Sequence, residues 1–274
     1  MNISIILPTH SLTDPIIETL NAINNQTFRP NEIIIIDSCN SVKIQLIIEN
    51  YTSSIPIIYH WVPKAFPGHA RNIGVNQAKN DVIAFLDSKT IPEKYWLSDY
   101  LNFFKIHKIL FIQGKTYYLA ENFFQNIIKS ATFGNHSHNT LPGSLIQKSY
   151  FKKIGGFNQS LRAGEDQEFI NKIYEYEDDT YIPEKNYLNY KGLPNTLYSC
   201  LFKYFIYSIH TAKVNIQISV KYAYLILFLL LAVFINNFLK ETSFFSLNIF
   251  HLDFIILFSI ISKSISNFIL PIIA

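Results

Sequence analysis

The stretch from Pro67 to Thr90 constrains the fold of this 274-residue chain more than any other. It ends with an apolar run, Val82 to Leu86, that is followed by Asp87. An apolar run this short, between a turn sequence and a polar cluster, is typical of a strand that is buried on both faces. Such strands occur in open α/β sheets, which bind their ligands at the carboxyl ends of the strands. We therefore expect Asp87 to lie at a ligand crevice.

Apolar runs and amphipathic segments alternate along the first third of the chain. Strands are expected at residues 3–7, 32–36, 55–61 and 82–86, and helices at 14–25, at 42–51 and around Arg71 and Asn72. Strand–helix–strand units need right-handed crossovers and parallel strands. The pattern therefore predicts an α/β fold with a doubly wound sheet. Further along, we expect helices at 93–107 and 122–132, a strand at 109–114, a loop at 133–142 and an amphipathic helix that opens at residues 165–166.

Charge separates the chain into two unlike parts. The 23 Lys and Arg and 20 Asp and Glu residues give a net charge of +3, which is too small to indicate a nucleic-acid partner. Residues 222–274 contain few charged side chains, namely Lys240, Glu241, Asp253 and Lys263. The tail is therefore expected to lie in a membrane, joined to the rest by an amphipathic, interfacial linker at residues 201–221.

Several short motifs follow one another in order. A strand ends in Asp37, GHARNIG occupies residues 68–74, FLDSK residues 85–89, IGGF residues 154–157 and GED residues 164–166. Each motif alone is common, but the ordered set resembles the family-2 glycosyltransferases of the GT-A fold. The resemblance covers residues 1–200. It implies a Rossmann-like, mixed but mainly parallel sheet and transfer of a sugar from a nucleotide-activated donor, with inversion.

The resemblance also implies which residues bind the donor. By similarity, Asp37 accepts a hydrogen bond from the nucleotide base, although this chain has Ser38 where the family usually has a second acidic residue. The guanidinium of Arg71 is suited to a bidentate contact with the diphosphate. The implied donor-binding residues are Pro8, Thr9, Asp37, Arg71, Asn72, Asp87 and Lys89.

The Asp87-Ser88-Lys89 turn departs from the family pattern. The family has Asp-x-Asp here, and its carboxylates hold a divalent cation, Mg²⁺ or Mn²⁺, on the donor diphosphate. Asp87 is thus the implied metal ligand, but a protonated lysine cannot ligate such a cation. Two interpretations stay open. Either the ammonium of Lys89 stabilises the leaving diphosphate, or the chain is a catalytically impaired nucleotide-sugar-binding or scaffold membrane protein.

The acidic pair Glu165-Asp166 opens a helix, where the helix dipole stabilises a carboxylate. Capping alone would explain such a pair. By resemblance, Asp166 is the base that removes the proton of the acceptor hydroxyl, and Glu165 supports it or contacts the acceptor. Gly143 and Ser144 resemble the acceptor-side strand of the family. The larger, processive members of the family carry a Gln-x-x-Arg-Trp motif on the interfacial helix. Nothing in this sequence matches it, so the resemblance implies transfer of single sugars.

The tail and the cysteines indicate where the protein works. Residues 222–239 carry no charge and are just long enough to span a bilayer of about 30 Å, whereas residues 250–273 are interrupted by Asp253 and Lys263. The expected arrangement is a spanning hairpin, or one span followed by a surface helix. Two distant cysteines, Cys39 and Cys200, favour a reducing compartment. The expected partners are a nucleotide sugar, a glycan or lipid-linked acceptor and membrane lipid, with the catalytic domain in the cytoplasm.

Overall fold

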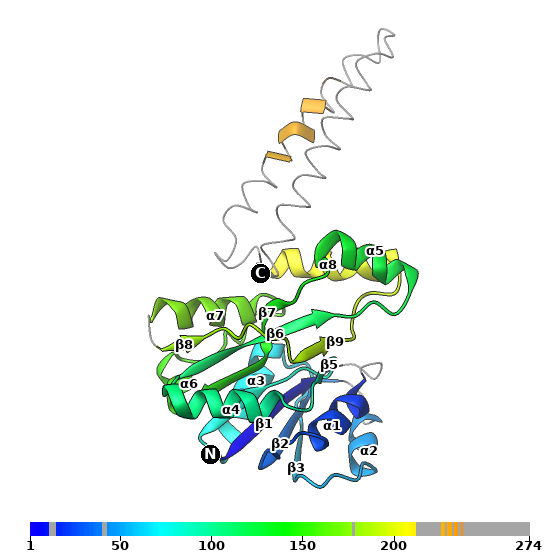
Figure 1. Cartoon of the computed structure of the whole chain (residues 1–274). Helices are drawn as coiled ribbons and strands as arrows, with labels where there is room; N and C mark the ends of the chain where they lie inside the picture. Colours follow the sequence, from blue (N-terminus) through cyan, green and yellow to red (C-terminus); the bar gives the residue numbers. More distant parts are fainter. Residues whose placement is uncertain are drawn as a thin grey trace.

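The chain folds around one mixed β-sheet (Figure 1). The structure, a computed structural model, describes residues 1–10, 15–39, 43–176 and 179–211, with a few positions between 226 and 237. Within these residues the sheet has nine strands in the order β3-β2-β1-β4-β7-β6-β9-β5, with β8 paired to β6. The strands are β1 (Ile3–Thr9), β2 (Glu32–Asp37), β3 (Ile57–Trp61), β4 (Val82–Phe85), β5 (Thr90–Pro92), β6 (Phe111–Tyr118), β7 (His138–Gln147), β8 (Thr180–Tyr181) and β9 (Leu188–Tyr190).

The first four strands are parallel and form the half of the sheet that the sequence predicts. Thr9 at the end of β1 is opposite Asp37 at the end of β2, so polar residues gather at the carboxyl edge. The other half is mixed, because β7 runs antiparallel to both β4 and β6. The expected mixed, mainly parallel α/β sheet is therefore confirmed.

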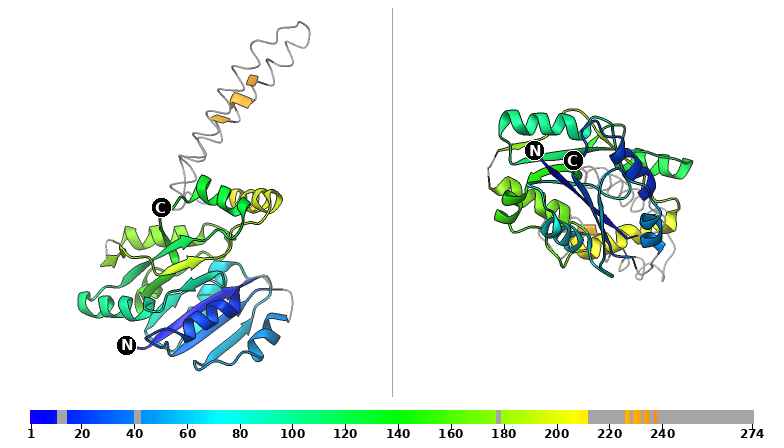
Figure 2. Two further views of the ribbon diagram at one scale, coloured as in Figure 1. Left: turned by 45° about the vertical axis from the view of Figure 1, so that its right-hand side comes forward. Right: turned by 90° about the horizontal axis from the view of Figure 1, so that it is seen from below.

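Helices cover both faces of the sheet, as Figure 2 shows. Alternate residues of β1 point to opposite faces. Ile5 and Leu7 pack with α1, α2 and α4, whereas Ile6 packs with α3, α6 and α7. The helices are α1 (Ile16–Asn24), α2 (Lys43–Glu49), α3 (Pro67–Gln77), α4 (Trp96–His107), α5 (Phe123–Thr132), α6 (Lys148–Lys153), α7 (Glu165–Glu175) and α8 (Leu197–Thr211).

Helix α3 lies unusually close to the sheet. A Cβ atom at Gly74 would stand 2.5 Å from Cγ2 of Ile6, so only a glycine allows this approach. Pro67 occupies the first turn of α3, where its missing N–H costs no hydrogen bond. Arg71 is thereby placed beneath the carboxyl ends of the central strands.

The chain after α4 differs from the sequence prediction in one respect. The expected loop at 133–142 is wrong over its second half, because His138 already begins the ten-residue strand β7. The side chain of His138 is buried against the ring of Tyr118, and its Nε2 lies 2.7 Å from the backbone oxygen of Phe133. This histidine therefore belongs to the core.

Helices α5 and α8 lie side by side above the sheet (Figure 1). A small cluster joins them, in which Ile128 of α5 packs with Leu193, and Cys200 of α8 lies against it. The first part of the predicted linker at 201–221 is thus helical, whereas the predicted anchor at 222–274 lies almost wholly outside the described residues. Among the described residues, no helix has both the length and the apolar character that a membrane crossing requires.

Candidate active site

A buried arginine connects the two acidic motifs of the chain. Nη2 of Arg71 lies 2.9 Å from Oδ1 of Asp87 at the end of β4, and Nη1 lies 2.8 Å from Oε1 of Glu165 at the start of α7. The side chain of Arg71 is only 5% exposed. In the sequence, Arg71 lies 16 positions before Asp87 and 94 positions before Glu165. These contacts therefore assemble the site from distant parts of the chain.

The aromatic core beneath this arginine fixes its position. The guanidinium carbon lies 5.5 Å from the ring centroid of Phe157, which packs against Phe85 and Phe169. Burial would lower the pKa of Arg71, but the charges of Asp87 and Glu165 raise it above its usual range. The arginine therefore remains charged while its two terminal nitrogens are occupied by carboxylates.

These contacts show which protein groups Arg71 meets. Each terminal nitrogen donates one hydrogen bond to a carboxylate, whereas the buried Nε has no partner among the described residues. The diphosphate contact of Arg71 stays a prediction. In this arrangement the arginine holds Asp87 and Glu165 in place.

Glu165 and Asp166 are neighbours with different environments. Glu165 is buried, and burial raises its pKa to about 7; the charge of Asp166 adds to this effect, and Arg71 opposes it. Asp166 is half-buried, and its Oδ1 accepts a hydrogen bond of 2.8 Å from the backbone N–H of Gln167. Only Asp166 is therefore placed where an acceptor hydroxyl could reach it.

Asn72 fastens the glycine-rich turn to α3. Its Nδ2 donates to the backbone oxygen of Phe157 (2.8 Å), and its Oδ1 accepts from the N–H of the same residue (3.0 Å). A Cβ atom at Gly156, whose φ is +69°, would lie 2.8 Å from Oδ1 of Asn72. Both ends of the Asn72 amide thus bond to the backbone of Phe157 and fix the turn against α3, while the donor contact of Asn72 stays a prediction.

The strand ends that were expected to hold the nucleotide base are close together but buried. Asp37 has no exposed surface; it accepts hydrogen bonds from the hydroxyl of Tyr59 (2.6 Å) and from the N–H of Cys39 (2.8 Å). Burial and the bond to Asp37 raise the pKa of Tyr59, so this phenol remains a donor. Next to Asp37, the buried hydroxyl of Thr9 has no hydrogen-bond partner among the described residues, and Pro8 is half-buried. Thr9 is therefore the polar group at this edge that a ligand could satisfy.

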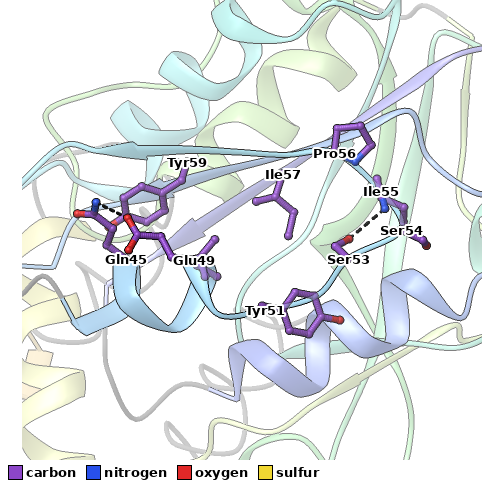
Figure 3. A pocket seen from close by; sticks show the side chains of 10 residues that line it. Gln45, Glu49, Tyr51, Ser53, Ser54, Ile55, Pro56, Ile57 and Tyr59 are labelled. Carbon is purple, nitrogen blue, oxygen red and sulfur yellow. Dashed lines mark hydrogen bonds between the residues drawn. The ribbon is translucent and has the colours of Figure 1, made fainter.

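Tyr59 also lines a separate cavity of about 720 Å³ at the outer edge of the sheet (Figure 3). This cavity lies between α2 and β3 and is formed by residues between 45 and 59. It contains none of the predicted site residues. We assign it no part in the chemistry below.

Gly143 and Ser144, predicted on the acceptor side, lie in strand β7 and are buried. Ser144 has no exposed surface, and its hydroxyl accepts from the N–H of Gly114 (2.9 Å) at an irregularity between β6 and β7. The backbone oxygen of Gly143 accepts from Nε1 of Trp96 (2.9 Å). Both residues thus make hydrogen bonds that support the sheet, and their acceptor-side role stays a prediction.

The donor set around Asp87 does not suit a divalent cation. Asp87 is already paired with Arg71, and the third residue of its turn is Lys89. Within the described part of the chain, no three His, Cys, Asp or Glu side chains come together in a way that could hold a metal ion. Mg²⁺ and Mn²⁺ prefer carboxylate oxygens in such sites. The implied metal ligand, Asp87, therefore lacks the partners that it would need.

Helix α8 brings residues to the site that the sequence analysis missed. Burial raises the pKa of Tyr207, and the negative charges of Glu165, Asp166 and Asp87 raise it further, which places this phenol next to the acidic cluster. Lys203, one turn earlier, and Arg162 line the same cavity as Lys89. The spacing of Lys203, Tyr207 and His210 along one helical face was the sequence signal for this role.

Comparisons with known proteins agree with this fold. The family model described as glycosyl transferase family 2 matches residues 4–171, more than half of the chain. An uncharacterized glycosyltransferase of Haemophilus influenzae is 25% identical over 231 residues, which cover 80% of this chain and 75% of that protein. The poly(ribitol-phosphate) β-N-acetylglucosaminyltransferase TarS of Staphylococcus aureus is 26% identical over 188 residues, 64% of this chain. The match covers only 32% of TarS.

Solved structures share the fold. TarS of S. aureus in complex with UDP-GlcNAc superposes with a TM-score of 0.58 at 22% identity, over 73% of this chain and 61% of that one. The mannosyltransferase PcManGT of Pyrobaculum calidifontis, in complex with GDP-Man and Mn²⁺, superposes with a TM-score of 0.55 at 15% identity, over 73% and 59% of the two chains. At these identities the likeness concerns the fold alone.

Proposed function

The chain belongs to glycosyl transferase family 2, and from this membership we propose that it transfers a sugar from a nucleotide-activated donor to an acceptor hydroxyl, with inversion. The observation that carries the proposal is the arrangement around Arg71. This one side chain holds Asp87, from the donor edge of the sheet, within reach of the helix start that carries Asp166. Donor and acceptor groups would meet between these two positions.

In the proposed reaction Asp166 is the base. Its carboxylate takes the proton of the acceptor hydroxyl while the hydroxyl oxygen forms a bond to the anomeric carbon. The bond from that carbon to the diphosphate oxygen breaks, and the nucleoside diphosphate leaves with the electron pair. A single displacement of this kind inverts the anomeric centre. The half-buried position of Asp166 supports this role, whereas Glu165 is buried and positions Arg71.

We propose that Lys89 stabilises the leaving diphosphate. Some relatives of this fold bind a divalent cation, as the Mn²⁺ complex of PcManGT illustrates, but the carboxylates that would hold one here are lacking in the described residues. Lys89 is held in place because its backbone oxygen accepts a hydrogen bond of 2.8 Å from the N–H of Lys191. A fixed positive charge beside the breaking bond stabilises the negative charge that develops on the leaving diphosphate in the transition state.

The relatives suggest the class of substrate. TarS acts on poly(ribitol-phosphate) and was solved with UDP-GlcNAc and with UDP. By analogy, we propose a nucleotide sugar as the donor and a glycan or lipid-linked glycan of the cell envelope as the acceptor. The chain spans about a third of the length of TarS, so this analogy concerns the catalytic domain.

We further propose that the protein works at the cytoplasmic face of a membrane. Exposed apolar side chains gather on α5 and α8, which lie side by side, including Phe123 (82% exposed), Tyr198 (78%) and Phe205 (61%). A monomeric soluble surface seldom exposes such a group of aromatic residues. The uncharged residues 222–239 follow α8 in the sequence. A bilayer that receives this tail would also cover the apolar face of the two helices.

The test is a transfer assay with the full-length protein in detergent, against a panel of nucleotide sugars and envelope-glycan acceptors. We expect release of nucleoside diphosphate that depends on the acceptor and continues in the presence of a chelator. Binding of a nucleotide sugar without any transfer would favour the alternative, a nucleotide-sugar-binding scaffold protein. This alternative arises because Lys89 stands where the family has an aspartate. Absence of binding across the panel would reject both.

A further inference from the structure

A cavity of about 920 Å³ lies between α8, the segment after β9 and the Asp87-Lys89 turn. Among the described residues, neither Thr9 nor Asp37, at the expected nucleotide edge, lines it. Its volume is at the upper end of the range of about 300–1,000 Å³ that small-molecule sites occupy. Because we place the leaving diphosphate at Lys89, this cavity is where the reacting sugars would lie.

His210 holds helix α8 against the start of α7, which carries Asp166. Its Nδ1 accepts a hydrogen bond of 3.3 Å from the backbone N–H of Arg162, three residues before α7 begins. Its ring also meets the ring of Phe66, the N-cap residue of α3, edge-on at 5.8 Å between centroids. Tyr207, one turn before His210, therefore lines the cavity close to Asp166. Burial raises the pKa of this phenol, and the nearby carboxylates of α7 raise it further.

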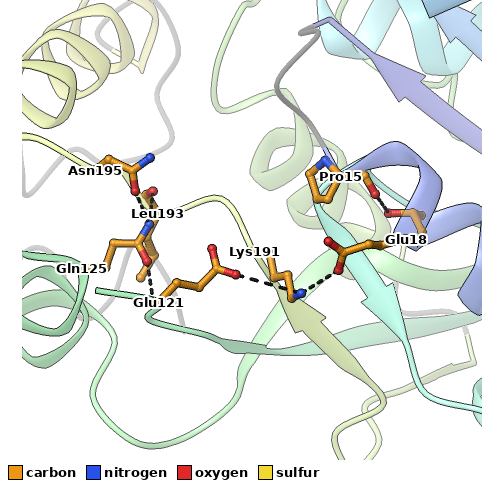
Figure 4. Close-up of polar contacts among 8 residues, drawn as sticks. Pro15, Glu18, Glu121, Gln125, Lys191, Leu193 and Asn195 are labelled. Carbon is orange, nitrogen blue, oxygen red and sulfur yellow. Dashed lines mark hydrogen bonds and ion pairs between the residues drawn. The ribbon is translucent and has the colours of Figure 1, made fainter. Parts of the chain in front are cut away.

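The charges around this cavity balance. On its lining, Nζ of Lys191 lies 2.6 Å from Oε2 of Glu18 and 4.0 Å from Oε1 of Glu121 (Figure 4). When the adjoining cluster around Arg71 is included, the described side chains comprise five cations and five carboxylates, namely Lys89, Arg162, Lys191, Lys203 and Arg71 with Glu18, Glu121, Asp87, Glu165 and Asp166. A neutral molecule that is rich in hydroxyl groups is more complementary to such walls than an anion.

Two amide side chains of the lining are fixed by hydrogen bonds. Nε2 of Gln125 donates to Oδ1 of Asn195 (2.7 Å) and to the backbone oxygen of Leu193 (2.8 Å), as Figure 4 shows. Oε1 of Gln125 accepts from the N–H of Glu121 (2.6 Å). Nδ2 of Asn122 donates to the same Oδ1 of Asn195 (3.1 Å). The Asn195 amide is thus held by its oxygen, and its Nδ2, which donates to none of the described residues, is available to a ligand hydroxyl.

Aromatic rings complete the lining of the cavity. They belong to Tyr190, Phe202 and Tyr207. Tyr207 is 41% exposed, so a ligand can reach it. The C–H groups on one face of a sugar pack well against such a ring, and the hydroxyls at the sugar's edge bond to amide groups. Aromatic rings, a fixed amide and balanced charges together are the chemistry that binds a neutral carbohydrate.

We infer that this cavity binds the acceptor as a neutral carbohydrate, and that its reacting sugar packs on the ring of Tyr207 with one hydroxyl directed to Asp166. The inference rests on the proposed function and deepens it, since it places the acceptor and names its chemical class. The contact is made by the ring of Tyr207 and does not depend on the phenol hydroxyl. Because the match to the family model ends at residue 171, α8 adds this acceptor contact from outside the shared domain.

The first test separates the ring of Tyr207 from its hydroxyl. Transfer by the full-length protein in detergent is measured with short neutral oligosaccharides of hexose and N-acetylhexosamine as acceptors. Tyr207→Leu is expected to raise the acceptor KM at least about tenfold, whereas Tyr207→Phe, which keeps the ring, should stay within about threefold of the wild type. Neither should change the Kd of the nucleoside diphosphate, measured by calorimetry. Tyr198→Leu, on a tyrosine of α8 that is 78% exposed and lies outside the cavity, is the matched control and should change neither quantity.

A second variant tests the inference without altering Tyr207. Asn195→Asp keeps an oxygen that can accept from Gln125 and Asn122 but loses Nδ2. It should raise the acceptor KM by about threefold to tenfold, the effect of one lost hydrogen bond, and leave the Kd of the nucleoside diphosphate unchanged. Asn135→Asp introduces the same charge at an exposed position outside the cavity and should change neither quantity.

The outcomes separate the inference from the proposed function. If the wild type binds no nucleotide and transfers no sugar to any acceptor, the proposed function fails. If it transfers a sugar, but Tyr207→Leu and Asn195→Asp leave the acceptor KM unchanged, the inference fails while the function stands. The same holds if Tyr207→Phe raises the acceptor KM as much as Tyr207→Leu does. Transfer to poly(ribitol-phosphate), the anionic acceptor of TarS, with none to neutral oligosaccharides would also overturn the inference.

Discussion

Arg71 decides the geometry of the site at the scale of single residues. A buried arginine that serves two carboxylates is expensive to desolvate, and the arrangement is stable because both terminal nitrogens have charged partners. Removing the guanidinium would leave Glu165 buried without its cation. The raised pKa of this glutamate means that it could then take up a proton near neutral pH.

We therefore predict that Arg71→Met lowers the stability of the domain by about 3 kcal/mol or more. Thermal unfolding in detergent, followed by circular dichroism, should show a Tm lower by roughly 6 to 12 °C. The exposed Arg29 provides the control, since Arg29→Met should shift the Tm by only about 1 °C. Equal stability of the Arg71 variant and the wild type would contradict a stabilising role for the contacts of Arg71 with Asp87 and Glu165. Partial recovery in the double variant with Glu165→Gln would support it.

Sequence reasoning at this scale found the residues but not their partners within the protein. It selected Arg71, Asp87, Glu165 and Asp166, and the structure brings all four together. It did not find that Arg71 pairs with Glu165 or that Asn72 bonds to the backbone of Phe157, because a motif shows which side chains are present and not which partners they meet. Those partners, Glu165 and the backbone of Phe157, lie more than 80 residues away along the chain.

At the scale of elements, the pattern predicted every strand of the parallel half of the sheet but few of the mixed half, among them β6 at 109–114. Strands β1, β2 and β4 contain buried, mainly apolar runs, β3 is a half-buried aromatic strand, and amphipathic helices lie between them, a pattern that is visible locally. Strands β5, β8 and β9 have only two or three residues each, and β5 exists because Thr90 to Pro92 pair with a segment almost 100 residues later. No local pattern encodes such a pairing.

Helix α8 shows how one element serves two surfaces. Its inner face carries Lys203, Tyr207 and His210, which line the cavity, and its outer face exposes Leu201 and Phe205. Sequence reasoning assigned the apolar side to a membrane surface and missed the polar side, because one lysine among many aromatic residues is commonly a solvated charge. The contact of Cys200 with the cluster below α8 is what fixes the rotation of the helix.

At the scale of the whole molecule, the proposed membrane placement makes a topological prediction. Lys213 and Lys221 precede the apolar residues 222–239, whereas the connection at Lys240-Glu241 has no net charge. By the positive-inside rule the catalytic domain should stay in the cytoplasm. A hairpin would return the chain to that side by Ala274.

Reporter fusions test this topology. A reporter that is active only in the cytoplasm should give signal when fused after Ala274 and none when fused at Lys240. If the fusion after Ala274 gives no reporter signal, the hairpin is contradicted. If the fusion at Lys240 also gives no signal, the result favours a single span followed by a surface helix. Signal at both sites would mean that neither segment crosses the membrane.

The most direct test of the central claim, that Asp166 is the base of an inverting transfer, separates binding from chemistry. Asp166→Asn should lower kcat for transfer by about 10²-fold or more, because it removes the proton acceptor. The Kd of the nucleoside diphosphate should stay nearly unchanged, because the donor contacts are kept. Glu175→Gln, on an exposed glutamate of the same helix, should keep full activity. The product anomer, read by nuclear magnetic resonance, should be opposite to that of the donor. A fully active Asp166→Asn protein, or a product with retained configuration, would contradict the account.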